Sequence, residues 1–342
     1  METSEFGHHF LIEIKGSELE SFERDLISEL CPLGIVLRSE NFAHSSNYPD
    51  VMAKYAALLG EVQALCGRDK LIVAAHADAN YGFQRPAPFT NFSSAASYVK
   101  NSAAAAKIIS EESLSAGVNL LIGPNSNVSV PGISPQAEPT EFSSAVDEVT
   151  QCACAFVSEA HKAGMLTCAF DFPGEGSAST KGRERKTCGL ILQELEHRDV
   201  RPFAALIDLK VDAIRLSDGL YGAVDADYPA FMSSALCAEL LRKKLGFSGV
   251  AISPEIRVGA LEKFYSLPEV MRAAFVAGCD LFHVPDLNFA LQLAQHLADV
   301  KLIKAAPEAA FDESADRLNR LYEAAQASSI KLLTGKGSAK EI

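Results

Sequence analysis

Acidic side chains follow several short apolar runs of this sequence, and they are the residues best suited to chemistry. Asp78, Asp171, Asp218 and Glu255 lie at or just beyond the ends of such runs, and Glu175 follows Asp171 by four positions. Carboxylates that meet in one cleft can act as nucleophile and general acid, or can hold a hydroxyl-rich ligand or a metal. The alternative is that Asp171 and Asp218 only form a hydrogen-bonded network at the rim of a site.

Two histidines, His76 and His283, also stand at the ends of apolar runs. We expect them to be structural and to bind no metal, because no partner at ligand spacing accompanies either one. Gly174-Glu-Gly176 lacks the third glycine and the Lys-Ser/Thr of a phosphate-binding loop. The sequence therefore predicts neither a metal nor a cofactor.

A basic cluster stands out in this acidic chain: Lys181, Arg183, Arg185 and Lys186. We expect a solvated loop here. The alternative is that these side chains meet a carboxylate or phosphate of a ligand or partner.

Eight short apolar runs alternate with longer amphipathic stretches along the chain. The runs cover residues 10–14, 33–37, 70–75, 118–122, 165–170, 213–216, 249–252 and 280–284. The helical stretches include residues 48–66, 95–116, 143–163, 230–245 and 287–298. Apolar runs without alternation are typical of parallel strands covered on both faces. Eight of them with intervening helices predict a (β/α)8 TIM-type barrel, with a doubly wound sheet as the alternative.

The barrel is expected to occupy residues 1–305, and residues 306–342 are expected to form a C-terminal helix and polar tail. Within the barrel, the Pro- and Ser-rich segment 124–141 and the Gly-rich segment 173–187 each follow a strand. These are predicted to be long loops on the carboxyl face, where barrels carry their functional sites.

Composition excludes some classes of partner. The 342 residues carry 31 Lys and Arg against 44 Asp and Glu, a net charge of −13, which disfavours nucleic acid and anionic membranes. The start of the chain has no basic segment and no long apolar run, so no signal peptide and no membrane span are expected. Eight scattered cysteines are typical of reduced thiols, and we expect a cytoplasmic protein.

Five motifs in sequence order resemble glycoside hydrolase family 3, in its single-domain β-N-acetylglucosaminidase branch. They are Gly34-Ile-Val-Leu-Arg-Ser-Glu-Asn-Phe42, Gly117-Val-Asn-Leu-Leu-Ile-Gly-Pro124, Phe172-Pro-Gly-Glu-Gly176, Gly246-Phe-Ser-Gly-Val-Ala-Ile-Ser253 and Ala277-Gly-Cys-Asp280. The resemblance covers roughly residues 10–300. It implies a (β/α)8 barrel and retaining hydrolysis by a carboxylate nucleophile and a proton donor.

The chain departs from this family at the positions that carry the chemistry. The resemblance places the nucleophilic aspartate at Pro254 and the acid/base pair at Lys181 and Arg183. Several sugar-binding positions also differ: the family's K-H-F-P-G-H-G is replaced by residues 170–176, its D-x-E-G-G-R by residues 76–81, and two further site residues by Asn127 and Asp218.

Two hypotheses follow. The first is a catalytically inactive family-3-like barrel, a pseudo-glycosidase that binds a polar small molecule or a protein partner at its mouth. Its candidate binding residues are His76, Asp78, Asn127, Asp171, Glu175, Asp218 and Glu255. The alternative is an active β-N-acetylhexosaminidase or related glycosidase with a rebuilt site, in which Glu255 acts with Asp171 or Asp218. Glu255 reaches such a site only if Pro254 bends the chain, since consecutive strand residues face opposite sides.

Overall fold

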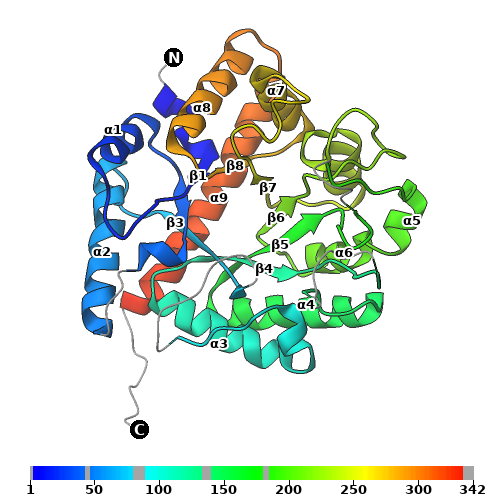
Figure 1. Ribbon diagram of the computed structural model, residues 1–342, viewed down its shortest axis with the longest axis horizontal. Coiled ribbons are helices and arrows are strands. Elements are labelled where there is room, and N and C mark those ends of the chain that lie inside the picture. Colours follow the sequence, from blue (N-terminus) through cyan, green and yellow to red (C-terminus); the bar gives the residue numbers. More distant parts are fainter. Residues whose placement is uncertain (1–2, 43–46, 80–88, 133–139, 180–184, 334–342) are drawn as a thin grey trace.

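The computed structural model describes residues 3–42, 47–79, 89–132, 140–179 and 185–333. Eight parallel strands form one closed barrel in sequence order, because β1 pairs with β8 as well as with β2 (Figure 1). The strands are β1 (Phe10–Ile12), β2 (Gly34–Val36), β3 (Ile72–His76), β4 (Leu120–Asn125), β5 (Leu166–Phe172), β6 (Ala213–Leu216), β7 (Val250–Glu255) and β8 (Leu281–Val284). The (β/α)8 prediction is confirmed, and closure excludes the doubly wound sheet.

Helices surround the strands and pack their apolar faces against them (Figure 1). The α-helices are α1 (Ser21–Leu30), α2 (Tyr48–Leu65), α3 (Ser102–Ser115), α4 (Val146–Ala163), α5 (Leu192–His197), α6 (Val200–Asp208), α7 (Leu267–Ala277), α8 (Leu287–Leu302) and α9 (Glu308–Leu333). Shorter 3-10 segments are η1 (Thr3–His9), η2 (Ser39–Asn41), η4 (Ala95–Asn101) and η5 (Ala230–Met232), and η6 (Ala235–Lys244) is a π-helix.

Local chemistry explains where these helices begin and end. In α4, Asp147 and Glu148 lie in the first turn and Lys162 in the last, so side-chain charges complement the helix dipole. Gly164 ends α4 with φ of +88°, a backbone conformation that glycine adopts without strain. Asp286 caps α8 by accepting a hydrogen bond from the backbone N–H of Phe289.

Two of the predicted helical stretches differ from continuous α-helices. Residues 95–116 are divided into η4 and α3, because Tyr98 has non-helical backbone angles. Residues 230–245 are divided into η5 and η6, separated by Ser233 and Ser234. Hydrophobic periodicity predicts that a helix is present but does not distinguish α, 3-10 and π hydrogen bonding.

Helix α9 closes the amino-terminal end of the barrel. Its buried residues Leu318, Leu321 and Ala325 belong to the same apolar cluster as the inward-facing strand residues, among them Ile72 and Leu120. In Figure 1 this helix, coloured orange to red, runs across the strands. Its packing leaves the opposite, carboxyl-terminal end of the barrel as the open mouth.

Ion pairs and hydrogen bonds attach α9 at this end. Arg317 donates through Nε and Nη2 to Oδ1 of the buried Asp280, at 3.0 and 2.9 Å, and Arg242 of η6 lies 2.5 Å from Oδ2. The Oη of Tyr322 donates to the backbone oxygen of Lys70, just before β3. The helix predicted near the C-terminus is therefore present and packed into the barrel. The boundary between 1–305 and 306–342 stays a prediction, and residues 334–342 lie outside the described part of the chain.

No helix among the described residues is long and apolar enough to cross a lipid bilayer.

Candidate functional site

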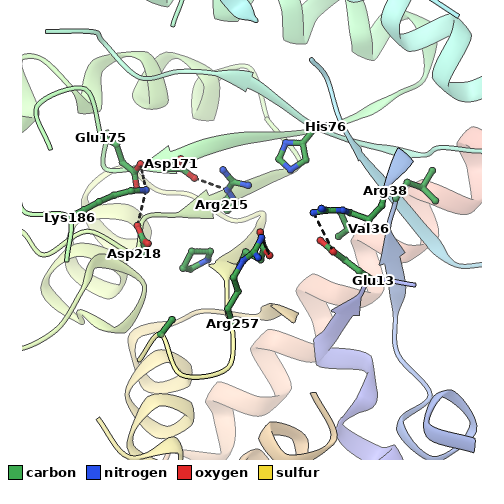
Figure 2. Close-up of a pocket in the computed structure, with 14 residues that line it drawn as sticks. Glu13, Val36, Arg38, His76, Asp171, Glu175, Lys186, Arg215, Asp218 and Arg257 are labelled. Atoms are coloured by element: carbon green, nitrogen blue, oxygen red, sulfur yellow. Dashed lines mark hydrogen bonds and ion pairs between the residues drawn. The ribbon is translucent and has the colours of Figure 1, made fainter. Parts of the chain in front are cut away.

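A polar cleft of about 300 Å³ lies at the carboxyl ends of the strands (Figure 2). His76 is the last residue of β3, Asp171 is next to last in β5, and Arg215 comes from β6. Because carboxyl ends of parallel strands meet at one end of a barrel, side chains far apart in sequence line a common cavity. The charged residues that line it are Glu13, Arg38, Asp171, Glu175, Lys186, Arg215, Asp218, Glu255 and Arg257.

Asp171 and Arg215 form a buried ion pair on one wall of this cleft. The Nε of Arg215 lies 2.7 Å from Oδ1 of Asp171, and only 11% and 10% of the two side chains are exposed. The guanidinium of Arg215 also lies over the ring of Phe170, 4.6 Å from its centroid. The pair and the ring together hold Arg215 in place.

Glu175, Lys186 and Asp218 form a second charged group beside that pair. The Nζ of Lys186 lies 2.8 Å from Oε2 of Glu175 and 3.1 Å from Oδ1 of Asp218, so one ammonium holds both carboxylates (Figure 2). Ser217 donates a hydrogen bond of 2.6 Å to Oε1 of Glu175.

Titration of this group is shifted by its surroundings. Burial, followed by the negative charge of Asp171, raises the pKa of Glu175 to about 7, although the Lys186 ammonium opposes the shift. Burial lowers the pKa of Lys186, but the carboxylates of Glu175 and Asp218 outweigh it, so the pKa is raised overall. Glu175 thus titrates near neutral pH, as a general acid or a proton-linked binding group would.

Backbone contacts fix the loop that carries Glu175. Gly174 has φ of +122°, and a Cβ there would lie 2.6 Å from the Cβ of Asp199, so no larger residue fits without strain. Tyr221 donates from its hydroxyl to the backbone oxygen of Gly174, and Oδ1 of Asn127 accepts from the backbone N–H of Glu175 at 2.8 Å. Asn127 therefore positions the loop.

The opposite wall is formed by side chains that follow β1 and β2. Glu13 Oε2 lies 3.5 Å from Nη1 of Arg38 (Figure 2). Glu13 Oε1 lies 3.1 Å from Nε2 of His283. Glu13 and Arg38 also line an adjoining cavity of about 330 Å³, together with Lys15 and Asp286. The mouth is therefore a longer cleft than the first cavity alone.

Pro254 and Glu255 both line the cleft, although they are consecutive residues of β7. The pairing of β7 with β8 shifts register between Ile252 and Glu255, and this irregularity turns both residues towards the mouth. Glu255 Oε1 lies 2.5 Å from Nη2 of Arg257. The bend that Glu255 needs in order to reach the site is present.

His76 lies buried in the floor of the cleft. Burial and the positive charge of Arg215 hold its pKa well below the ordinary value, so its imidazole is neutral at pH 7. In the part of the chain that the structure describes, no three His, Cys, Asp or Glu side chains are grouped to hold a metal ion.

The structure brings five of the seven candidate binding residues together at the cleft, namely His76, Asp171, Glu175, Asp218 and Glu255. Asp78 and Asn127 are buried nearby and do not line it. Lys181 and Arg183, which the resemblance places at the acid/base pair, lie outside the described residues.

The expectation of a solvated basic loop is wrong for two of its members. Arg185 donates from Nη1 to the hydroxyl of Tyr265 at 2.7 Å and lies over the ring of Phe264, and Lys186 is bound by Glu175 and Asp218. The acidic side chains and aromatic rings of neighbouring loops supply partners that the sequence does not place beside them.

The cleft is also lined by four charged residues that were not predicted as site residues from the sequence, namely Glu13, Arg38, Arg215 and Arg257. A signal exists in the sequence for three of them, because Glu13 and Arg215 lie within apolar runs and Arg38 directly follows one. Arg257 lies five residues beyond the run 249–252 and has no such signal. In a (β/α)8 barrel, charged residues at the carboxyl ends of the strands are expected to face the mouth.

A closed (β/α)8 barrel with a charged cleft at its carboxyl end defines the class of this protein. Residues 31–321 match the Glycosyl hydrolase family 3 N terminal domain, and the chain belongs to this family.

Curated relatives include two proteins named Beta-hexosaminidase. That of Methylococcus capsulatus is 29% identical over 286 residues, covering 80% of this chain and 81% of the relative. That of Tolumonas auensis is 27% identical over 285 residues, covering 79% and 80%.

Solved structures show the same fold. The glycoside hydrolase family 3 β-N-acetylglucosaminidase from Paenibacillus sp. str. FPU-7 has a TM-score of 0.85 at 22% identity, covering all of this chain and 64% of that one. The β-N-acetylhexosaminidase from Beutenbergia cavernae has a TM-score of 0.80 at 23% identity, covering 94% and 98%.

Proposed function

We propose that this family-3 barrel is a pseudo-glycosidase, which binds a small polar ligand at its mouth without hydrolysing it. The observation that carries the proposal is Pro254, which lines the cleft where the family resemblance places the nucleophilic aspartate. A proline side chain has no atom that can attack a sugar carbon or stabilise the positive charge that develops there.

The pairing of the remaining carboxylates supports the same proposal. Each carboxylate that lines the cleft has a cation within 3.5 Å: Arg38 for Glu13, Arg215 for Asp171, Lys186 for Glu175 and Asp218, and Arg257 for Glu255. A neighbouring cation lowers the basicity and the nucleophilicity of a carboxylate, although burial outweighs this effect at Glu175, whose pKa is raised to about 7. The arrangement is therefore better suited to binding polar groups than to forming a glycosyl–enzyme bond.

The second candidate is an active glycosidase with a rebuilt site. The relatives named Beta-hexosaminidase favour it, and so does Glu175, whose pKa of about 7 is that of a general acid. The nucleophile would then be Glu255, or Asp171 or Asp218 close to Glu175. Hydrolysis that is lost in Glu255→Gln, with folding unchanged, would support this candidate.

Ligand binding can be tested by filling the cleft. Ala260 lines the cleft and is exposed, so Ala260→Trp places an indole in the mouth without disturbing the core. Ala223 is also exposed but does not line the cleft, and Ala223→Trp is the matched control. We expect amino sugars to raise the Tm of the wild type and of Ala223→Trp but not of Ala260→Trp. Equal shifts in all three proteins would place binding elsewhere and contradict the proposal.

We also propose a reducing compartment such as the cytoplasm. All eight cysteines are free thiols, and six of them are buried. Burial raises the pKa of Cys66, Cys168 and Cys237 to about 12, which keeps these thiols protonated and unreactive.

A further inference from the structure

Among the residues that the structure describes, one wall of the cleft carries more negative than positive charge. Asp171, Glu175 and Asp218 form what we call the acidic wall, and among the described residues only Lys186 and Arg215 pair with them. The remaining pairs of the cleft, Arg38 with Glu13 and Arg257 with Glu255, are balanced one to one. When all of its carboxylates are ionised, the acidic wall with its two cations therefore has a net charge of −1.

Two of the three carboxylates of the acidic wall are largely buried. The side chains of Asp171 and Glu175 are only 10% and 15% exposed, whereas that of Asp218 is 49% exposed and partly screened by water. An uncompensated charge among buried groups is costly and draws in a proton or another cation. The raised pKa of Glu175 agrees with this argument, because a proton on its carboxyl group removes one negative charge from the acidic wall.

We propose that the acidic wall binds the protonated amine of a ligand, and that the cleft prefers an unacetylated amino sugar to its N-acetylated form. This inference rests on the proposed function, because it assumes that the cleft binds a small polar molecule. An ammonium group between Glu175 and Asp218 would balance the wall, as a second partner beside Lys186. An N-acetyl group is uncharged and would not neutralise the excess negative charge of the acidic wall.

The size and the other walls of the cleft suit the rest of such a ligand. About 300 Å³ is at the lower end of small-molecule sites and corresponds to a compact ligand such as a single sugar. Arg38, Glu13 and Arg257 line the cleft away from the acidic wall and offer donors and acceptors for hydroxyl groups. Figure 2 shows Glu13 and Arg38 across the cavity from Glu175 and Lys186.

Binding of an amine should be linked to loss of the proton from Glu175. Among the described residues, the charged and polar groups that act on Glu175 are Asp171 of β5, Lys186 of the following loop, Ser217 and Asp218 after β6, and Tyr221. A ligand cation favours the ionised carboxylate, so affinity for an amine should weaken as pH falls from about 7 to about 5. Affinity for an uncharged sugar should not fall in this way.

Calorimetric titration of the full chain with glucosamine, N-acetylglucosamine and glucose tests the inference. At about pH 7 we expect glucosamine to bind at least about tenfold more tightly than the two uncharged sugars. Glu175→Gln should remove most of this preference. Glu239→Gln changes the net charge equally at an exposed helix position and is the matched control. Circular dichroism and Tm confirm that each variant is folded.

The outcomes separate this inference from the proposed function. If N-acetylglucosamine or glucose binds as tightly as glucosamine, the inferred preference for an amine is wrong. The proposed function, binding of a small polar ligand in the cleft, is then still supported. If glucosamine is preferred equally by the wild type and by Glu175→Gln, the acidic wall is not responsible and the inference is also wrong. If none of the three sugars binds the wild type, the proposed function fails and the inference fails with it.

Discussion

Asp171 and Arg215, on the neighbouring strands β5 and β6, form an ion pair with 2.7 Å between Oδ1 and Nε. The family resemblance places Asp171 at the first histidine of the K-H-F-P-G-H-G motif and Phe170 at its lysine. In this chain the guanidinium of Arg215 lies against that phenylalanine. The side chains of Asp171 and Phe170 thus both contact Arg215.

Breaking this pair on one side should destabilise the protein. Arg215→Met leaves the carboxylate of Asp171 buried without its cation, and we expect a loss of about 2–4 kcal/mol in the free energy of unfolding. Urea denaturation measures this loss. The double variant Asp171→Asn with Arg215→Met should regain most of it, because neither charge of the pair remains.

An exposed ion pair provides the control. Arg201 and Asp147 lie 2.8 Å apart, but their side chains are 52% and 75% exposed. Arg201→Met should change stability by less than about 0.5 kcal/mol. Equal losses in Arg215→Met and Arg201→Met would show that burial of the Asp171 pair does not matter.

Helix α9 should be required for a folded barrel. Leu318→Ala and Leu321→Ala each remove apolar volume from the cluster that closes the amino-terminal end, at an expected cost of about 2–4 kcal/mol apiece. Leu302 is 70% exposed, and Leu302→Ala should cost little. A chain ending at residue 306 should lose cooperative thermal unfolding. A cooperative transition in that truncated chain would show that α9 is dispensable.

Glu175 should make stability depend on pH in a defined direction. Its pKa is about 7 in the folded protein and near 4.5 when exposed, so between these values the folded state holds a proton that the unfolded state releases. Stability contributed by this proton is present below about pH 4.5 and is lost as pH rises through about 7.

Glu175→Gln has no such proton to lose. Relative to the wild type, its free energy of unfolding should therefore improve between about pH 5 and about pH 8, as measured by urea titrations at both values. A difference that is constant over this range would show that the Glu175 pKa is not raised.

Much of the fold follows from the sequence, and less of the site does. All eight apolar runs are strands, because parallel strands buried on both faces leave a pattern that no amphipathic helix produces. Strand ends correctly indicated His76 and Asp171 as neighbours, since topology alone brings them to one mouth.

The sequence does not predict which charged side chains form ion pairs with one another in the cleft. Arg215 lies 44 positions from Asp171, and the partners of Lys186 come from two different loops. The register shift that turns Glu255 into the cleft depends on how β7 pairs with β8, a relationship between strands that no local pattern encodes.

Restoring the nucleophile alone should not restore hydrolysis. Pro254→Asp would place a carboxylate in the cleft, but the family resemblance puts Lys181 and Arg183 where the acid/base pair should be, and protonation of the leaving group contributes about 10²–10⁴-fold. Steady-state assays with an aryl β-N-acetylglucosaminide should therefore stay at background for this variant. Substantial turnover would show that another residue, with Glu175 the first candidate, already serves as the acid.

The most direct test of the central claim combines binding and turnover in one purified sample. The wild-type protein is saturated with chitobiose or an aryl β-N-acetylglucosaminide, and released product is followed beside calorimetric binding of amino sugars. We expect binding at the mouth, abolished by Ala260→Trp, with product formation no faster than in buffer. Turnover by the wild type that disappears in Glu255→Gln or Glu175→Gln would contradict the account and establish an active glycosidase with a rebuilt site.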